Sequence, residues 1–289
     1  MACPRAALRH NRLMISTLIE RWRHGRRVEI PDAQWQAALA ALPCAQSLPA
    51  PERERLRGLV AGLLADKQFE AAAGIELTTQ MQLAIAVQAC LPVLGLGLEW
   101  YRGWTSIVVY PGEFRVPRRL TDEAGVVHEF DDTLSGESWD GGPVVVSWAD
   151  AQSAGTPQAY SVVIHEFAHK LDMLDGEADG VPPFDRRLHP TLTAATWRAA
   201  LTDALARLDA ELELIEAELP PHIDPDSPEA DPWYARLPLD PYAVQDEAEF
   251  FAVSAEAFFV APATLQAAFP AWYEQLAAFF RQDPLSATP

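Results

Sequence analysis

Two histidines and a glutamate within residues 165–172, which read HEFAHKLD, have the types and spacing of a catalytic metal site. His165 and His169 are four residues apart, so on a helix both imidazoles lie on one face and can bind one metal ion. Glu166 then points beside the ion, which suits a general base for a water molecule rather than a ligand. Zinc is the expected ion, because imidazole suits it and it leaves a coordination position open. We therefore predict a hydrolytic site with one Zn²⁺ per chain.

The residues around this motif predict an active-site helix over 157–175. Thr156 and Pro157 have the types of a helix start, with a hydroxyl cap followed by proline at the first helical position. The segment that follows is strongly apolar, as in a helix buried in a core. Gly176 can adopt the left-handed conformation that ends many helices.

Catalytic zinc usually has three protein ligands, so one more must come from elsewhere in the chain. Asp175 lies six residues after His169, where a longer form of the motif places its last ligand, but that form needs glycine at position 172. Glu249 is the better candidate, because it precedes two phenylalanines in an apolar segment and a buried carboxylate needs a cation or a hydrogen-bonding partner. Glu256 follows seven residues later and can face the same way.

Two acidic residues near these candidates have alternative interpretations. Asp246 can cap a helix over 246–260, in which case Glu249 completes a capping box three residues later. Spacing alone does not separate that interpretation from metal binding. Asp172 shares a helix face with the histidines, where it either orients one of them or is a surface acid near the helix end.

The composition is that of a folded, acidic protein. The chain has 289 residues, of which 49% are hydrophobic and 22% charged, so it can bury a sizeable core. Its formal charge of −19 argues against nucleic-acid binding, because phosphate contacts need a basic surface. Scattered cysteines and the absence of an apolar run near the ~18 residues of a membrane span indicate a cytoplasmic protein without membrane contact.

The elements that must position the site are helices on both sides of a short β-rich region. Apolar stripes predict helices in four stretches: 32–73, 79–91, 194–219 and 270–281. β-Rich runs predict strands at three places: 107–110, 126–130 and 144–148. The last strand directly precedes the motif helix and is either a sheet edge, where an extended peptide could pair with it, or a core strand. His128-Glu129 lacks a second histidine four residues on and belongs to a strand.

Two segments have unusual charge. Residues 1–27 contain seven arginines and one glutamate, as in an amphipathic or frayed terminus. Residues 211–238 are rich in acidic residues and proline, and we interpret this segment as a solvated loop or lid.

Separated motifs between about residues 50 and 284 also carry a family resemblance: Leu96–Trp100, Ser135–Trp139, His165–Asp172, Gly180–Pro182 and Tyr242–Glu256. In this order they resemble the Mlc titration factor A family of zinc-dependent peptidases. The arm before Ala50 and the insert near 220–238 are less like the family.

The resemblance implies a gluzincin-type site. His165, His169 and Glu249 would hold zinc, Glu166 would be the base, and Tyr242 would match a catalytic tyrosine also seen in lethal-factor-like peptidases. The alternative interpretation of Tyr242 is an aromatic side chain packed beside Pro241. Family members cleave short peptides, in particular as aminopeptidases, and some bind the glucose-responsive repressor Mlc. The alternative is a regulatory binding protein whose zinc site is structural or idle.

The predicted fold is α+β. A zincin-like metallopeptidase domain over 50–284 follows an N-terminal arm with helices over 1–49. The domain comprises a helical part (50–95), a small mixed sheet (100–150) packed on the active-site helix (157–175), and a C-terminal helical part (190–284).

Overall fold

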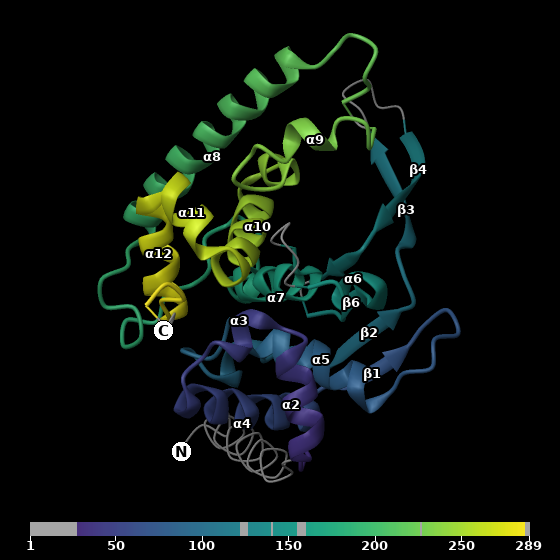
Figure 1. The fold of residues 1–289 in the computed structure, drawn as a ribbon, viewed down its shortest axis with the longest axis vertical. Coiled ribbons are helices and arrows are strands. Elements are labelled where there is room, and N and C mark those ends of the chain that lie inside the picture. Colours follow the sequence, from purple (N-terminus) through teal and green to yellow (C-terminus); the bar gives the residue numbers. More distant parts are fainter. Residues whose placement is uncertain (1–27, 122–126, 140, 155–159, 226, 287–289) are drawn as a thin grey trace, which may run out of the picture.

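The computed structural model describes residues 28–121, 127–139, 141–154, 160–225 and 227–286, which form helices packed beside one four-stranded sheet, and a two-stranded ribbon (Figure 1). The helices before the sheet are α2 (Asp32–Ala40), α3 (Pro43–Gln46), α4 (Ala50–Asp66) and α5 (Thr79–Cys90). Those after it are α6 (Trp148–Ala151), α7 (Val162–Asp172), α8 (Ala194–Glu218), α9 (Asp231–Tyr234), α10 (Glu247–Val260), α11 (Pro262–Ala268) and α12 (Pro270–Phe280). Three short 3-10 helices complete the set: η1 (Leu98–Tyr101), η2 (Met173–Asp175) and η3 (Pro241–Val244).

The sheet is small and mixed, as predicted, but its first strand at 68–71 lies outside the predicted range of 100–150 and in a stretch that was wrongly predicted to be helical. Its strands lie in the order β1 (Gln68–Ala71), β2 (Ser106–Tyr110), β6 (Val144–Ser147) and β5 (Gly136–Ser138). The first three are parallel, and β5 runs antiparallel to β6. A separate antiparallel ribbon contains β3 (Phe114–Thr121) and β4 (Val127–Leu134). The α+β class is therefore confirmed, and the division of the chain at residue 49 stays a prediction.

The strand predicted at 144–148 is an inner strand, so the sheet-edge alternative was wrong. β6 pairs with β2 on one side and with β5 on the other, and its residues are all buried. Trp148 is already the first residue of α6. Among the described strands, the edge nearest to α7 is β5, which contacts that helix directly.

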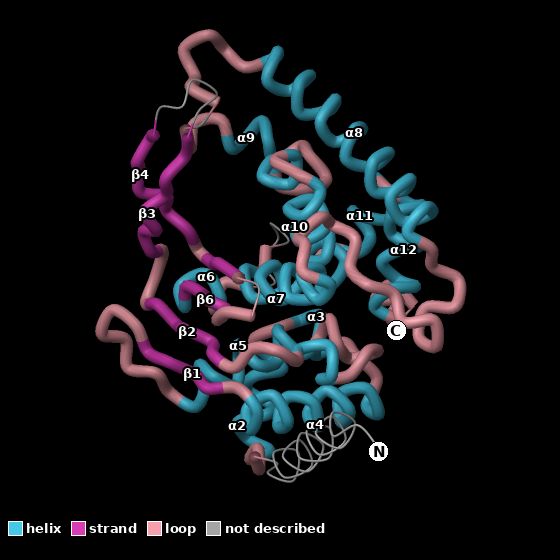
Figure 2. Tube along the Cα trace, turned by 180° about the vertical axis from the view of Figure 1, so that it is seen from behind, coloured by secondary structure: helices cyan, strands magenta, loops and turns pink. Residues whose placement is uncertain are grey.

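Helix α7 lies at the centre of the molecule. Figures 1 and 2 show it between the N-terminal helices α2–α5 and the C-terminal helices α10–α12. It packs on α10, on α5 and on strands β5 and β6. Val163, Phe167 and Leu171 are fully buried, so the apolar residues of the motif segment fill the core as the sequence predicts.

The predicted start of this helix was wrong, whereas its end was correct. Tyr160 and Ser161 are not helical, and Thr156 and Pro157 lie outside the described residues. Ser161 is the N-cap, because its Oγ accepts the backbone N–H of Ile164 at 3.2 Å. After the 3-10 turn η2, Gly176 takes the left-handed conformation with φ 104°.

Helix α8 corrects the prediction for the acidic segment. It begins at a capping box formed by Thr193 and Thr196 and continues to Glu218. Residues 211–218 are therefore helical, and only the residues after them lie in the turns that lead to α9.

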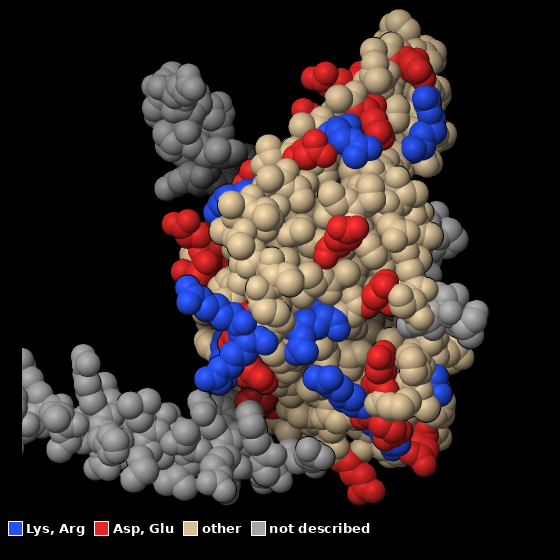
Figure 3. Space-filling view, turned by 90° about the vertical axis from the view of Figure 1, so that its left-hand side faces the viewer, with Lys and Arg blue, Asp and Glu red and all other residues tan. Residues whose placement is uncertain are grey.

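The described surface fits the composition. The face in Figure 3 carries both acidic and basic side chains around a broad uncharged area, without the continuous basic surface that phosphate contacts need. None of the helices in the described part of the chain has the length and apolar character required to cross a bilayer.

His189 joins the segment after α7 to the last helix of the core. Its Nε2 lies 2.9 Å from the carbonyl oxygen of Phe279, and its Nδ1 accepts the backbone N–H of Asp185 at 3.1 Å. These contacts require the neutral ring with its proton on Nε2. Burial is the main cause of a lowered pKa for His189, which is only 3% exposed.

This lowered pKa predicts a loss of stability in mild acid. In the unfolded chain the imidazole of His189 takes up a proton near pH 6.5, whereas in the folded chain it does so only at lower pH. The neutral ring therefore stabilises the fold above pH 6.5, and this contribution is lost as the pH falls below that value. The free energy of unfolding changes through this one group by at most about 1.4 kcal/mol per pH unit. We expect the difference in free energy of unfolding between wild type and His189→Gln to shrink from pH 7.5 to pH 5, measured by denaturant titration at constant metal content. A constant difference across this range would contradict the prediction.

Candidate metal centre

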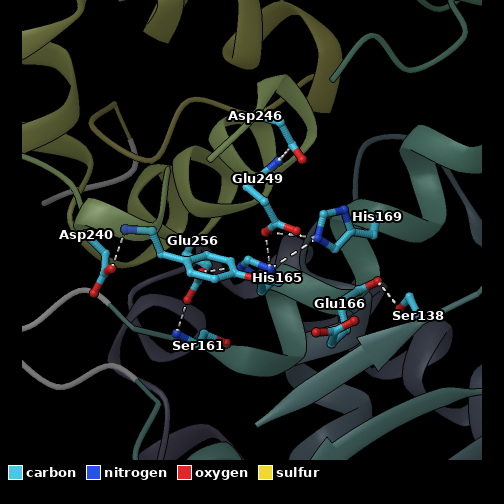
Figure 4. A network of polar contacts seen from close by, with 10 residues as sticks. Ser138, Ser161, His165, Glu166, His169, Asp240, Asp246, Glu249 and Glu256 are labelled. Carbon is cyan, nitrogen blue, oxygen red and sulfur yellow. Dashed lines mark hydrogen bonds and ion pairs between the residues drawn. The ribbon is translucent and has the colours of Figure 1, made fainter. Parts of the chain in front are cut away.

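Three side chains from two helices converge on one point (Figure 4). His165 and His169 of α7 place their Nε2 atoms 3.1 Å apart. Oε2 of Glu249, in the first turn of α10, lies 3.1 Å from the first of these nitrogens and 3.4 Å from the second. Among the described residues, this is the group whose side chains come close enough to share an ion.

The chemistry of these atoms fits a cation. Oε2 of Glu249 is buried and makes no hydrogen bond of good geometry among the described residues, although both nitrogens are near it. A buried carboxylate oxygen in this state is costly unless a cation compensates it. Two imidazole nitrogens and a carboxylate oxygen are also a known ligand set for a catalytic metal.

The electrostatics of these side chains agree with this assignment. Burial opposes ionisation of Glu249, but the two histidines outweigh it and lower the pKa of its carboxyl to about 2. Burial lowers the pKa of His165, but the nearby carboxylates of Glu249 and Glu256 more than reverse this, so that its pKa is raised overall. Both shifts have the same origin, which is the attraction between the carboxylates and a positive charge at the histidines. A bound metal ion would supply such a charge in place of a proton.

Glu166 lies beside this centre and is not one of the three converging residues. Its side chain is only 5% exposed, and its Oε2 is buried without a hydrogen-bond partner in the described part of the chain. Burial is the main cause of its raised pKa. A carboxyl in this environment takes up a proton more readily than one in water, as a general base must.

Strand β5 holds Glu166 in place. Oγ of Ser138 donates a hydrogen bond of 2.9 Å to the carbonyl oxygen of Glu166. Gly136 lies against its side chain, since a Cβ atom there would be 2.3 Å from Oε1 and 2.6 Å from Cγ. Only glycine leaves room for the carboxylate at this point of the strand.

We expect Gly136→Ala to displace the Glu166 carboxylate while leaving the three converging residues in place. A misplacement of about 1 Å can lower a catalysed rate on the order of a hundredfold, so hydrolysis should fall strongly with little change in metal affinity. Metal affinity and kcat/KM, measured on the same samples, test this. Gly112→Ala is the control, because a Cβ atom there meets nothing within 4 Å. Equal activity of the two variants would contradict the expected clash.

The residues considered for a third ligand lie in different places in the structure. Asp175 is exposed in η2 and is not part of the group of three. Asp246 does cap α10, because its Oδ1 accepts the backbone N–H of Glu249 at 2.9 Å. The side chain of Glu249 is directed at the histidines (Figure 4), so Asp246 caps the helix but Glu249 does not complete a capping box.

Glu256 and Asp172 are both buried and have different partners. Oε1 of Glu256 lies 2.8 Å from Nδ1 of His165. Oδ2 of Asp172 accepts the backbone N–H of Gly180 at 2.8 Å, and burial raises its pKa to about 7. Asp172 is thus not a surface acid, and the hydrogen bonds found for it reach a loop rather than a histidine.

Gly180, the partner of Asp172, also contacts two other helices. Its carbonyl oxygen accepts the indole N–H of Trp197 at 2.7 Å, and its φ of +72° is a conformation that favours glycine. A Cβ atom there would lie 2.3 Å from the carbonyl oxygen of Glu247. The residue therefore joins the end of α7 to α8 and to the start of α10.

Tyr242 lies in η3, just before α10. Its ring centroid is 6.2 Å from that of His165, and its side chain is 42% exposed. Oδ1 of Asp240 accepts its backbone N–H at 2.9 Å and holds the turn. The ring therefore borders the centre from the solvent side.

Comparison with known proteins agrees with this geometry. The family described as glucose-regulated metallo-peptidase M90 matches residues 17–281. Similar relatives include proteins named Mlc titration factor A from Yersinia pestis (strain Pestoides F) and from Yersinia pseudotuberculosis serotype O:1b (strain IP 31758). Each is 36% identical over 255 residues, which cover 88% of this chain and 86% of the relative. A peptidase family of this kind implies a metal ion, for which the three converging residues are compatible. The chain belongs to the glucose-regulated metallo-peptidase family M90, to which its resemblance to the Mlc titration factor A family had pointed.

Proposed function

We propose that this protein is a zinc-dependent metallopeptidase of the gluzincin type, with a zincin-like domain, that hydrolyses short peptides as an aminopeptidase. The observation that carries the proposal is the convergence of His165, His169 and Glu249 beside a buried Glu166. In this assignment the first three residues hold one Zn²⁺. Bound zinc would supply a Lewis acid that acidifies water and polarises the scissile carbonyl.

The chain's own residues would perform the proton transfers. Glu166 takes a proton from the attacking water and gives it to the leaving amine, and burial favours the protonated carboxyl between the two transfers. Tyr242 donates a hydrogen bond from its hydroxyl to the developing oxyanion, an effect of roughly 3 kcal/mol in comparable sites. Its position beside His165 at the solvent side supports this role.

Strand β5 offers a way to hold the substrate. Among the described strands, β6 is its only partner, so one of its edges has no strand beside it. An extended peptide can add to such an edge through its backbone. Since β5 also contacts Glu166 through Gly136 and Ser138, a peptide bound there would pass beside the proposed base.

A regulatory role is the second candidate, and the name of the relatives, Mlc titration factor A, favours it. We propose that the chain also binds a sugar-responsive repressor of the Mlc type. In the alternative reading this binding is the main function and the zinc site is structural or idle. Both readings place the protein in the cytoplasm, which agrees with the free thiols of Cys44 and Cys90.

A substrate panel tests the enzymatic proposal. The zinc-loaded protein is expected to hydrolyse aminoacyl anilides faster than carboxylic or phosphate esters, to lose this activity with a chelator and to regain it with Zn²⁺. Faster ester or phosphate hydrolysis would instead identify a non-peptidase hydrolase. Hydrolysis of none of these substrates, combined with tight repressor binding, would favour the regulatory reading.

A further inference from the structure

Glu256 uses both carboxylate oxygens to join α10 to the start of α7. It lies seven residues after Glu249 and is only 3% exposed. Its Oε1 is 2.8 Å from Nδ1 of His165, and its Oε2 accepts the backbone N–H of Ser161 at 2.5 Å. The side chain therefore binds the first histidine of the motif and the residue that caps the same helix (Figure 4).

The bond to His165 determines which ring nitrogen is available. A carboxylate accepts hydrogen bonds, so Nδ1 of His165 must carry the proton that it donates to Glu256. In the neutral ring, Nε2 then has the free lone pair. This nitrogen is the one that faces His169 and Glu249, both at 3.1 Å. Because Glu256 binds the opposite edge of the ring, it is not itself a metal ligand.

The same chain of contacts continues to α5. Oγ of Ser161 donates to Oε1 of Gln88 at 2.9 Å and accepts the N–H of Ile164 at 3.2 Å. Nε2 of Gln88 donates to the carbonyl oxygen of Ala151 at 2.9 Å, which directs its Oε1 at Ser161. Gln88 is itself only 3% exposed, so water does not compete for these bonds.

We propose that Gln88, Ser161 and Glu256 form a positioning network for His165. The network fixes the ring's tautomer and orientation, and it fixes the start of α7 relative to α5 and α10. Gln88 and Glu256 thereby increase metal affinity without touching the metal. Partners of this kind generally change metal affinity or activity by about 10–100-fold. The inference rests on the metal site of the proposed function.

Zinc affinity, measured by competition with a chromogenic chelator, tests the network. Glu256→Gln keeps one acceptor oxygen for two N–H groups, so we expect its zinc dissociation constant to rise about 10–100-fold. Gln88→Leu, which leaves the His165 bond in place, should give a smaller rise in the same direction. Ser254→Ala is the matched control, because this buried hydroxyl of α10 has no hydrogen-bond partner among the described residues. It should bind zinc as wild type does.

A second measurement needs no variant. In a long-range ¹H–¹⁵N spectrum of the zinc-loaded wild type, Nδ1 of His165 should carry a proton and Nε2 should show the shift of a metal-bound nitrogen. A metal-bound Nδ1 would overturn the inference, as would unchanged zinc affinity in both network variants. If wild type binds no zinc, the metallopeptidase proposal fails instead, which keeps the two failures distinguishable.

Discussion

Glu166→Gln is expected to abolish most peptide hydrolysis while the protein still binds zinc. The amide has nearly the same shape as the carboxyl and fits the same space against Gly136, but it cannot take a proton from water. General base catalysis typically contributes about 10²–10⁴-fold, so kcat should fall by that factor. Steady-state kinetics on an aminoacyl anilide, combined with metal analysis of the same sample, measure both quantities.

The control for this variant is Glu177→Gln, an exposed acid beyond the end of α7. It should change neither activity nor zinc content. If Glu166→Gln hydrolyses peptides at the wild-type rate, Glu166 is not the base. If it loses hydrolysis and keeps repressor binding, the two proposed activities are separate functions of one chain.

Loss of the Glu249 carboxylate is expected to have the largest effect on metal binding. Glu249→Ala removes the only converging group from α10 and leaves two histidines, so zinc affinity should fall by more than the ~10–100-fold typical of an outer partner. Hydrolysis at limiting zinc should be lost with it. Isothermal titration with Zn²⁺ gives the affinity, and activity assays with excess zinc show whether the remaining site can still function.

Asp175→Asn is the comparison that separates the two candidates for third ligand. Asp175 is exposed and lies outside the group of three, so this variant should bind zinc like wild type. A loss of affinity in Asp175→Asn together with normal affinity in Glu249→Ala would reverse the assignment.

The motif helix was the most predictable element, because its two histidines, its apolar face and Gly176 all lie within one stretch of sequence. Its first residue was not predictable to the same degree. Thr156-Pro157 and Ser161 are both acceptable starts by residue type. The choice of Ser161 depends on Gln88 and Glu256, which hold its hydroxyl and its N–H, and these contacts come from distant parts of the chain.

The convergence of Glu249 on the histidines could be anticipated because a carboxylate inside an apolar helix needs a partner. Only half of the competing capping-box interpretation holds, since Asp246 caps the helix through the backbone N–H of Glu249 but the Glu249 side chain lies at the histidines and does not complete the box. Local spacing could not show which way the Glu249 side chain turns. The only sequence signal for Glu256 was its spacing of seven residues from Glu249. Gln88 had no signal, because a single polar residue on an apolar helix does not indicate which residue it bonds to.

Sheet order was the least predictable feature. Strand β5 has three residues, Gly136–Ser138, without any apolar alternation, and β1 is mostly exposed. Both exist because they pair with neighbours, which is a tertiary effect that strand propensity does not capture. The continuous apolar run of β6 is typical of a strand buried on both faces, which is its actual position.

The direct packing of α10 on α7 has a thermodynamic consequence. An ion held by His165, His169 and Glu249 would cross-link α7 and α10. The chain between these helices includes α8, α9 and the acidic turns, so this link would close a long loop. Closing so long a loop restricts an unfolded chain more than closing a short one does. Since the native helices already meet without that link, changes of length in the turns between α8 and α9 would leave the spacing of the ligand atoms intact, whereas Gly180 and Tyr242 tie other parts of this segment to α7.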